Sequence, residues 1–218
     1  MQASERPGWA YPGAMEAITN QREFYSPSMR ALQDRFDGRR LADRLEQVTL
    51  HHAFSADDRE FIDGATTLFL ATSDEQGWPD CSYKGGRPGF VRTIGDADLA
   101  FAIYDGNSQF RSLGNVLANP RVGLLFIDPA RTRRLRVNGT ARVVLTEDDP
   151  AFTASFPGSV AVVTVQALQI FPNCNRYIHQ PGGDLSVHAP AEGHEPPEAE
   201  WKSMDLFADV LPGTTDPS

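Results

Sequence analysis

Residues 133–145, RRLRVNGTARVVL, alternate between apolar or small side chains and polar ones. The first set is Leu135, Val137, Gly139, Ala141, Val143 and Leu145, and the second is Arg134, Arg136, Asn138, Thr140 and Arg142. Because successive side chains of a strand point to opposite faces, the segment is predicted to be a long strand with one buried face. Its arginine face fits two interpretations, a solvated barrel surface or a site for an anionic ligand.

Shorter β-rich runs flank this strand on both sides. The run at 66–72, TTLFLAT, ends in the turn sequence DEQG, and further strands are expected near 79–84, 89–94, 98–103, 121–127 and 160–171. Turn signals lie at Gly85-Gly86, Gly95-Asp96 and Asp128-Pro129. Short strands with frequent turns favour a barrel or sandwich, because closure removes exposed sheet edges.

One helix is predicted inside this series of strands. Ser108 is its expected N-cap, and Asn119-Pro120 ends it; Phe110, Leu113, Val116 and Leu117 share one face. The turn at 105–107 precedes it. Unpaired N–H groups at a helix start bind phosphate well, so the entry at 105–111 is a candidate anion site, although capping by Ser108 is also a sufficient explanation.

A third candidate is the segment 82–86, Ser-Tyr-Lys-Gly-Gly. A hydroxyl, an aromatic ring and a cation come before two glycines, which let another group approach the backbone. A two-glycine hairpin without any ligand explains the same residues.

Composition limits the classes of protein to consider. The 218 residues, 40% of them hydrophobic, fit one globular domain, and the net charge of −9 argues against nucleic acid or an anionic membrane as the main partner. We find no membrane-length apolar run and no signal-peptide pattern, so a soluble, cytoplasmic protein is expected. Cys81 and Cys174 are expected to be buried free thiols, and the histidine spacing predicts no metal site.

The chain is expected to have three parts. Residues 1–54 are predicted to form a helical N-terminal extension, and Ser55 with Asp58 resembles a capping box before a short helix over 56–63. Residues 55–180 are expected to form the barrel. Residues 181–218 form an acidic, proline-rich tail that is expected to dock on the barrel or on a second subunit through its apolar residues, Trp201, Leu206, Phe207, Val210 and Leu211.

Four segments carry motifs in a characteristic order: DCSYKGGRPGFV at 80–91, YDGN at 104–107, SLGN followed by NPRVGLLF at 112–126, and LRVNG at 135–139. Together they resemble the pyridoxamine 5′-phosphate oxidase-like family of FMN-binding split barrels, over about residues 55–180. The segment NCNRYI at 173–178 is similar to the CPRYI segment of one subgroup, with Asn175 in place of the proline.

The resemblance implies a mainly β fold with flanking helices, a six-stranded antiparallel split barrel of Greek-key type that forms a homodimer and holds FMN at the dimer interface. The resemblance implies that Ser82, Tyr83 and Lys84 contact the flavin ring and its ribityl chain or phosphate. It also implies that Tyr104, Asn107 and Ser108 lie near the phosphate and ribityl groups. Tyr83, Tyr104 or Phe110 would supply the aromatic surface that packs against the flavin ring. Arg134 and Arg136 would lie on the arginine face, and Arg176 would reach the site across the dimer.

The activity that the resemblance implies is that of an FMN-dependent oxidoreductase acting on an unidentified small molecule. Residues 176–179 carry an arginine and a histidine at a spacing that differs from the C-terminal Arg-x-His motif of true pyridoxamine phosphate oxidases, which argues against vitamin B6 oxidation. Two alternatives stay open on the same fold: an F420-dependent reductase, and a protein that binds flavin or haem without turnover.

Overall fold

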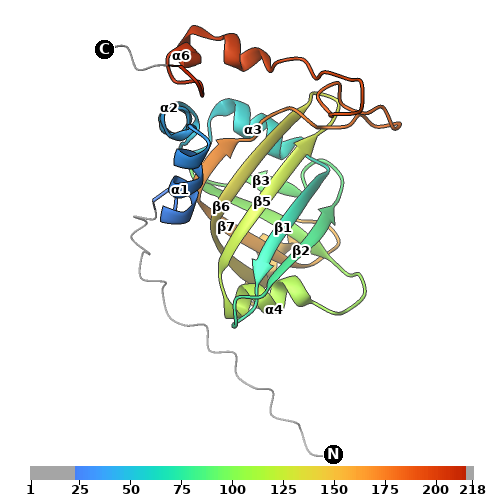
Figure 1. Ribbon diagram of the computed structural model, residues 1–218. Coiled ribbons are helices and arrows are strands. Elements are labelled where there is room, and N and C mark those ends of the chain that lie inside the picture. Colours follow the sequence, from blue (N-terminus) through green and yellow to red (C-terminus); the bar gives the residue numbers. More distant parts are fainter. Residues whose placement is uncertain (1–22, 215–218) are drawn as a thin grey trace, which may run out of the picture.

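A seven-stranded antiparallel sheet, curled into a split barrel, forms the centre of the protein (Figure 1). The computed structural model describes residues 23–214. The strands are β1 (Thr67–Ser73), β2 (Pro79–Gly85), β3 (Val91–Thr93), β4 (Asp98–Tyr104), β5 (Arg121–Asp128), β6 (Arg133–Leu145) and β7 (Ser159–Pro172), and their order in the sheet is β2-β1-β5-β6-β7-β4-β3. The mainly β split barrel is confirmed, but the sheet has seven strands rather than six because the three-residue β3 adds to the edge beside β4.

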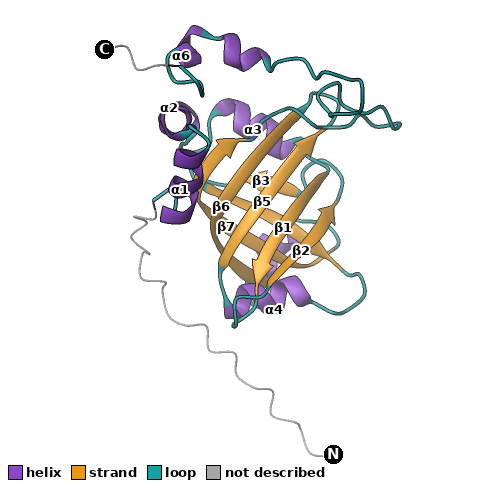
Figure 2. Ribbon diagram, in the orientation of Figure 1, coloured by secondary structure: helices purple, strands orange, loops and turns teal. Residues whose placement is uncertain are grey.

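Helices surround this sheet without entering it (Figure 2). They are α1 (Pro27–Arg35), α2 (Arg39–Thr49), α3 (Ala56–Asp63), α4 (Arg111–Ala118), α5 (Pro150–Ala154), the 3₁₀ turn η1 (Glu200–Ser203) and α6 (Asp205–Ala208). In Figure 1, α3 and α4 cover opposite ends of the barrel. The barrel interior is therefore closed at both ends by short helices.

The alternation of β6 produces the core face predicted for it. Leu135, Val137 and Val143 are buried with Phe101 of β4 and Phe126 of β5, whereas Arg136 and Arg142 are exposed. A bulge at Asn138/Gly139 brings Gly139 so close to the backbone oxygen of Gln166 that a Cβ there would clash. Only glycine fits this approach of β6 to β7.

The capping box at the start of α3 is confirmed. The Ser55 hydroxyl accepts a hydrogen bond from the Asp58 N–H, and Asp58 accepts one from the Ser55 N–H at 3.0 Å. Asp58 is buried and also lies 2.8 Å from His51 Nε2. His51 forms a β-bridge with Ile170 of β7, so this group of contacts fastens the N-terminal extension to the barrel.

Within residues 23–54 the extension contains the helices α1 and α2, while residues 1–22 lie outside the described residues. Its apolar residues stay largely exposed in a single chain: Met29, Leu32, Phe36 and Val48. The C-terminal tail returns to this extension. Arg44 of α2 pairs with Asp209 at 2.9 Å, and Asp37 accepts a hydrogen bond from the Gly213 N–H at 2.7 Å.

The apolar residues of the tail differ in their burial. Phe207 and Val210 are buried, and the ring of Phe207 meets that of Trp201 edge to face at 5.5 Å. Leu206, by contrast, is exposed. Residues 215–218 lie outside the described residues.

Candidate functional site

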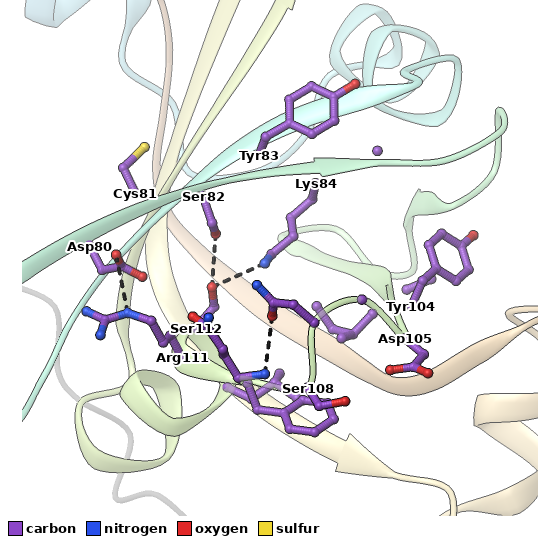
Figure 3. A pocket seen from close by; sticks show the side chains of 18 residues that line it. Asp80, Cys81, Ser82, Tyr83, Lys84, Tyr104, Asp105, Ser108, Arg111 and Ser112 are labelled. Atoms are coloured by element: carbon purple, nitrogen blue, oxygen red, sulfur yellow. Dashed lines mark hydrogen bonds and ion pairs between the residues drawn. The ribbon is translucent and has the colours of Figure 1, made fainter.

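A cavity of about 530 Å³ opens between β2, the end of β4, the loop at 105–110 and the start of α4 (Figure 3). Its volume falls in the range of roughly 300–1,000 Å³ that is typical of small-molecule sites. In the sheet, β2 is one edge strand and β4 is next to the other edge. The cavity therefore lies at the seam where the two ends of the curled sheet approach each other.

The alternation of β2 divides its side chains between two faces. Ser82 and Lys84 are half-buried and point into the cavity, whereas Cys81 and Tyr83 are exposed and point away from it (Figure 3). The Tyr83 ring instead meets Phe69 of β1 edge to face at 5.8 Å. The expectation that both cysteines are buried is wrong for Cys81, because its position in the strand faces outward.

Ser112, in the first turn of α4, joins the polar groups of the cavity. Its buried hydroxyl lies 2.9 Å from the Ser82 hydroxyl and accepts a hydrogen bond from Lys84 Nζ at 3.2 Å. Burial lowers the pKa of the Lys84 ammonium, and the Asp80 carboxylate opposes this shift. A cation and two hydroxyl groups are thus held together beside a helix start, where an anion would relieve the cost of burying the ammonium.

The helix begins two residues later than an N-cap at Ser108 would place it. Arg111 is the first residue of α4 and Phe110 occupies the N-cap position, so the prediction of Ser108 as N-cap is wrong. Asn107 is the physical reason, because its side chain accepts a hydrogen bond from the Gln109 N–H at 3.2 Å and forms a turn there. Ser108 and Phe110 then adopt left-handed backbone conformations, with φ of 55° and 49°.

This entry loop leaves the start of α4 open to a ligand. A phenylalanine side chain cannot accept hydrogen bonds from the first-turn N–H groups. Left-handed conformations in non-glycine residues cost about 1–3 kcal/mol each and gather at ligand-binding segments. Arg111 adds a second cation at the rim, with its Nε 3.8 Å from the Asp80 carboxylate.

The structure brings seven of the ten sequence-predicted residues to this cavity: Ser82, Tyr83, Lys84, Tyr104, Asn107, Ser108 and Phe110. Tyr83 belongs to the lining of the cavity, but its ring points away from it. Gln109 and Arg111 fall within the helix entry at 105–111 that the sequence marked as a candidate anion site but were not named as ligand contacts, and Ser112 lies outside it. Ser112 was missed because its role comes from contacts with Ser82 and Lys84 of β2, which lie far from it in the sequence.

The three predicted arginines lie elsewhere in the chain. Arg134 donates hydrogen bonds to the backbone oxygens of Cys174 and Arg176, Arg136 is exposed with its guanidinium 5.9 Å from the ring centre of Phe171, and Arg176 Nε donates to Cys174 Sγ at 3.4 Å. None of them lines the cavity of its own chain among the described residues. Their role at FMN stays a prediction that requires a second copy of the chain.

Within residues 23–214, no group of three or more His, Cys, Asp or Glu side chains is arranged to hold a metal ion. None of the helices that the structure describes combines the length and apolar composition of a membrane-spanning segment.

Comparison with known proteins assigns the barrel to a family. Residues 54–172 match the family described as pyridoxamine 5′-phosphate oxidase. The chain belongs to this family. The match contains β1 to β7 and the whole cavity, whereas α1, α2 and the C-terminal tail lie outside it.

Solved structures of similar fold have low sequence identity to this member of the pyridoxamine 5′-phosphate oxidase family. HupZ of Group A Streptococcus is 19% identical with a TM-score of 0.43, and the match covers 60% of this chain and 98% of that one. An FMN-binding protein from Syntrophomonas wolfei is 14% identical (TM-score 0.39; 67% and 97% covered). The heme storage protein HutZ from Vibrio cholerae is 20% identical (TM-score 0.38; 55% and 94% covered). No curated protein matches the sequence.

Proposed function

We propose that this protein is an FMN-dependent flavoprotein oxidoreductase that acts on a small molecule as a cytoplasmic homodimer. The observation that carries the proposal is the cluster of Lys84, Ser82 and Ser112 at the open start of α4, inside a cavity of about 530 Å³. Membership of the pyridoxamine 5′-phosphate oxidase family supports it.

The donor set of the cavity fits the phosphate of FMN. A phosphate monoester carries close to two negative charges at neutral pH. Lys84 offers an ammonium, Ser82 and Ser112 offer hydroxyl groups, and the first turn of α4 offers backbone N–H groups. The carboxylates of Asp80 and Asp105 also line the cavity, and Asp80 is the one that pairs with Arg111. A bound phosphate would compete with Asp80 for that guanidinium.

The apolar part of the cavity suits the flavin ring. Tyr104, at the end of β4, and Phe110, before α4, are large rings that remain partly exposed in a single chain. Packing against them would remove apolar surface from water on both sides of the contact. FMN would supply the hydride and electron chemistry, while these side chains would orient the ring and exclude water from one side of it.

The outer face of the sheet supports the homodimer. Direct cross-strand neighbours form one row that runs from β2 to β7: Tyr83, Phe69, Leu125, Arg136 and Phe171. Tyr83 is 62% exposed, although it is a large aromatic side chain. A row of this kind suits an interface, because aromatic residues and arginine are enriched there. A partner that covers it would also bring its own Arg136 toward this chain.

The visible absorption spectrum of the purified protein tests the cofactor, followed by mass spectrometry of any molecule released on denaturation. Released FMN, or FMN bound on addition, supports the proposal, and consumption of NAD(P)H that depends on a second substrate supports turnover. Released F420 or haem would assign the site to another cofactor. Tight FMN binding with no reductase or oxidase activity would leave a flavin-binding protein and reject the enzyme.

Light scattering during gel filtration tests the dimer at micromolar protein concentration. We expect the mass of two chains. A monomer that still binds FMN tightly would contradict an interface site. Phe69→Arg is the sharper variant, since it puts a charge between Tyr83 and Leu125 in the outer row and should dissociate the dimer and release FMN together.

A further inference from the structure

A second cavity, of about 410 Å³, lies where both extensions meet the end of β7. Phe24 and Tyr25 come from the N-terminal side, Phe171 from β7, and Trp201 and Phe207 from the tail. Among the described residues that line the two cavities, none is shared. This site therefore depends on the parts of the chain outside the family match.

The walls of the second cavity are mainly aromatic. Phe24 meets Phe171 edge to face at 4.9 Å, and Trp201 meets Phe207 in the same way at 5.5 Å. Ring edges and faces of this kind favour a flat, apolar guest, because stacking adds to the free energy of removing apolar surface from water. The cavity lacks the ammonium and hydroxyl cluster that marks the first site, and its ligand must differ accordingly.

A polarised thiol belongs to the same lining. Arg176 Nε donates a hydrogen bond to Cys174 Sγ at 3.4 Å, and Cys174 and Trp201 both line the cavity. Arg134 holds the segment 174–176 in place by donating hydrogen bonds to the backbone oxygens of Cys174 and Arg176. Burial opposes ionisation of the thiol, but the hydrogen bonds and the charge of Arg176 outweigh it, so the pKa of Cys174 lies below its ordinary value.

We propose that Cys174 and this cavity form a second site, which captures small aromatic α,β-unsaturated carbonyl compounds as covalent thioethers. The aromatic walls select the ring of such a compound, and the sulfur attacks its β-carbon. In the reaction the thiolate lone pair forms the C–S bond, the C=C π electrons move to give an enolate, and the enolate α-carbon takes a proton from water. The thiolate is the nucleophilic form of cysteine, so the cation beside it promotes the addition.

The other cysteine is the matched control. Cys81 is exposed on the outer face of β2, and its side chain points away from the first cavity, to whose lining the residue belongs (Figure 3). The sequence has two cysteines, so Cys81→Ser leaves Cys174 as the single thiol and Cys174→Ser leaves Cys81. Both variants keep the full-length chain.

The experiment measures the rates at which N-phenylmaleimide and N-ethylmaleimide add to each variant, by intact-protein mass spectrometry. For Cys174 we expect the phenyl-to-ethyl rate ratio to exceed that of glutathione by at least about tenfold, because the cavity binds the ring. For Cys81 the ratio should match that of glutathione. N-phenylsuccinimide, which has the ring but no reactive double bond, should protect Cys174 from N-ethylmaleimide and leave Cys81 unprotected.

The role of the guanidinium has its own measurement. In the Cys81→Ser background, Arg176→Gln should move the pH at which the N-ethylmaleimide rate is half-maximal to a higher value. A ratio for Cys174 equal to that of glutathione, or absence of protection by N-phenylsuccinimide, would overturn the aromatic site. An unchanged pH profile in Arg176→Gln would overturn the activated thiol.

Discussion

The barrel and the two extensions are held together by different interactions. The barrel has a core of fully buried side chains such as Phe101, Phe126 and Leu99. The extensions rely on ion pairs and hydrogen bonds at partly exposed positions, as between Arg44 and Asp209, and leave Phe36 of the α1 C-terminus 71% exposed. The barrel has the means to fold as a unit, whereas the extensions need it as a surface to fold upon.

The same division separates the two cavities. The first is polar, belongs to the family match and depends on strand alternation and a helix start. The second is aromatic and exists only because the extensions close over the end of β7. A family fold thus supplies one site, and the flanking segments add another without changing it.

Phe101→Ala tests the comparison between the barrel and the extensions and is expected to have the largest effect on stability. Phe101 is fully buried, so its truncation should lower the free energy of unfolding by about 3–5 kcal/mol. Phe36→Ala removes the same ring from an exposed position and should change it by less than about 0.5 kcal/mol. Urea denaturation of both variants measures the difference. Similar losses would show that the extensions contribute to the core after all.

Lys84→Ala has the next largest expected effect and tests the first cavity. Loss of a charged hydrogen bond to the phosphate should weaken FMN binding by about 1.5–3 kcal/mol, measured by flavin fluorescence titration. The sequence has two lysines, and Lys202→Ala, in the tail, is the matched control with no expected change. Unchanged affinity in Lys84→Ala would remove this residue from the site.

The pH dependence of the same binding follows from the lowered pKa of Lys84. The ammonium loses its proton at a lower pH than an ordinary lysine, so FMN affinity should fall as alkaline pH is approached. Bound phosphate should raise the pKa again, and binding there should take up protons. Lys84→Arg keeps a charged group and should resist the decline. Equal declines in both proteins would assign the effect to another group.

Asp58→Asn tests the link between the barrel and the N-terminal extension. Burial alone would raise the pKa of Asp58, but hydrogen bonds from Ser55 and His51 outweigh it and hold the pKa below its usual value. The charged form therefore stabilises the fold above the unfolded-state pKa of about 3.9, and this stabilisation is lost as pH falls through the folded value.

For Asp58→Asn we expect a loss of about 1–2 kcal/mol at neutral pH, measured by urea denaturation. The gap to the wild-type protein should close in acid. A gap that stays constant down to low pH would mean that the charge of Asp58 does not contribute.

Asp80→Asn has the smallest expected effect. Removal of this carboxylate frees Arg111, which it contacts at 3.8 Å, and should strengthen FMN binding by about 0.2–1 kcal/mol. Fluorescence titration at low ionic strength measures the gain. Asp105→Asn is the comparison, since that carboxylate also lines the cavity but forms no ion pair with Arg111 among the described residues. Weaker FMN binding in Asp80→Asn would mean that its pairing with Arg111 positions the guanidinium for the phosphate.

Local patterns in the sequence predicted much of this molecule. The alternation of β6 predicted its buried face, and Ser55 with Asp58 predicted the start of α3 at Ala56. The start of α4 could not be predicted in the same way. Ser108 is a good capping residue, but the turn that Asn107 forms with the Gln109 N–H includes Ser108, and the helix starts after it. The residue types alone do not decide between a cap at Ser108 and a turn at Asn107.

The candidate site was predictable where it depended on residues close in sequence. Ser82 and Lys84 share a face because they are two residues apart on one strand. Ser112 was missed because its importance comes from a contact with β2, thirty residues away in sequence. The prediction that Arg136 and Arg142 lie on the outer face of β6 is confirmed. The ligand or partner that contacts this face depends on other parts of the assembly, which the sequence of one strand does not encode.

The seam position of the first cavity has a mechanical consequence. The cavity joins β2 and β4, strands that the sheet order keeps apart, so a molecule bound there ties the two ends of the sheet together. At a concentration of 100 times its dissociation constant, such a ligand adds about 2.7 kcal/mol to the free energy of unfolding. Amide hydrogen exchange would then slow most where β2 and β4 approach each other, so a ligand of this cavity would stabilise the fold in addition to any chemistry that it supplies.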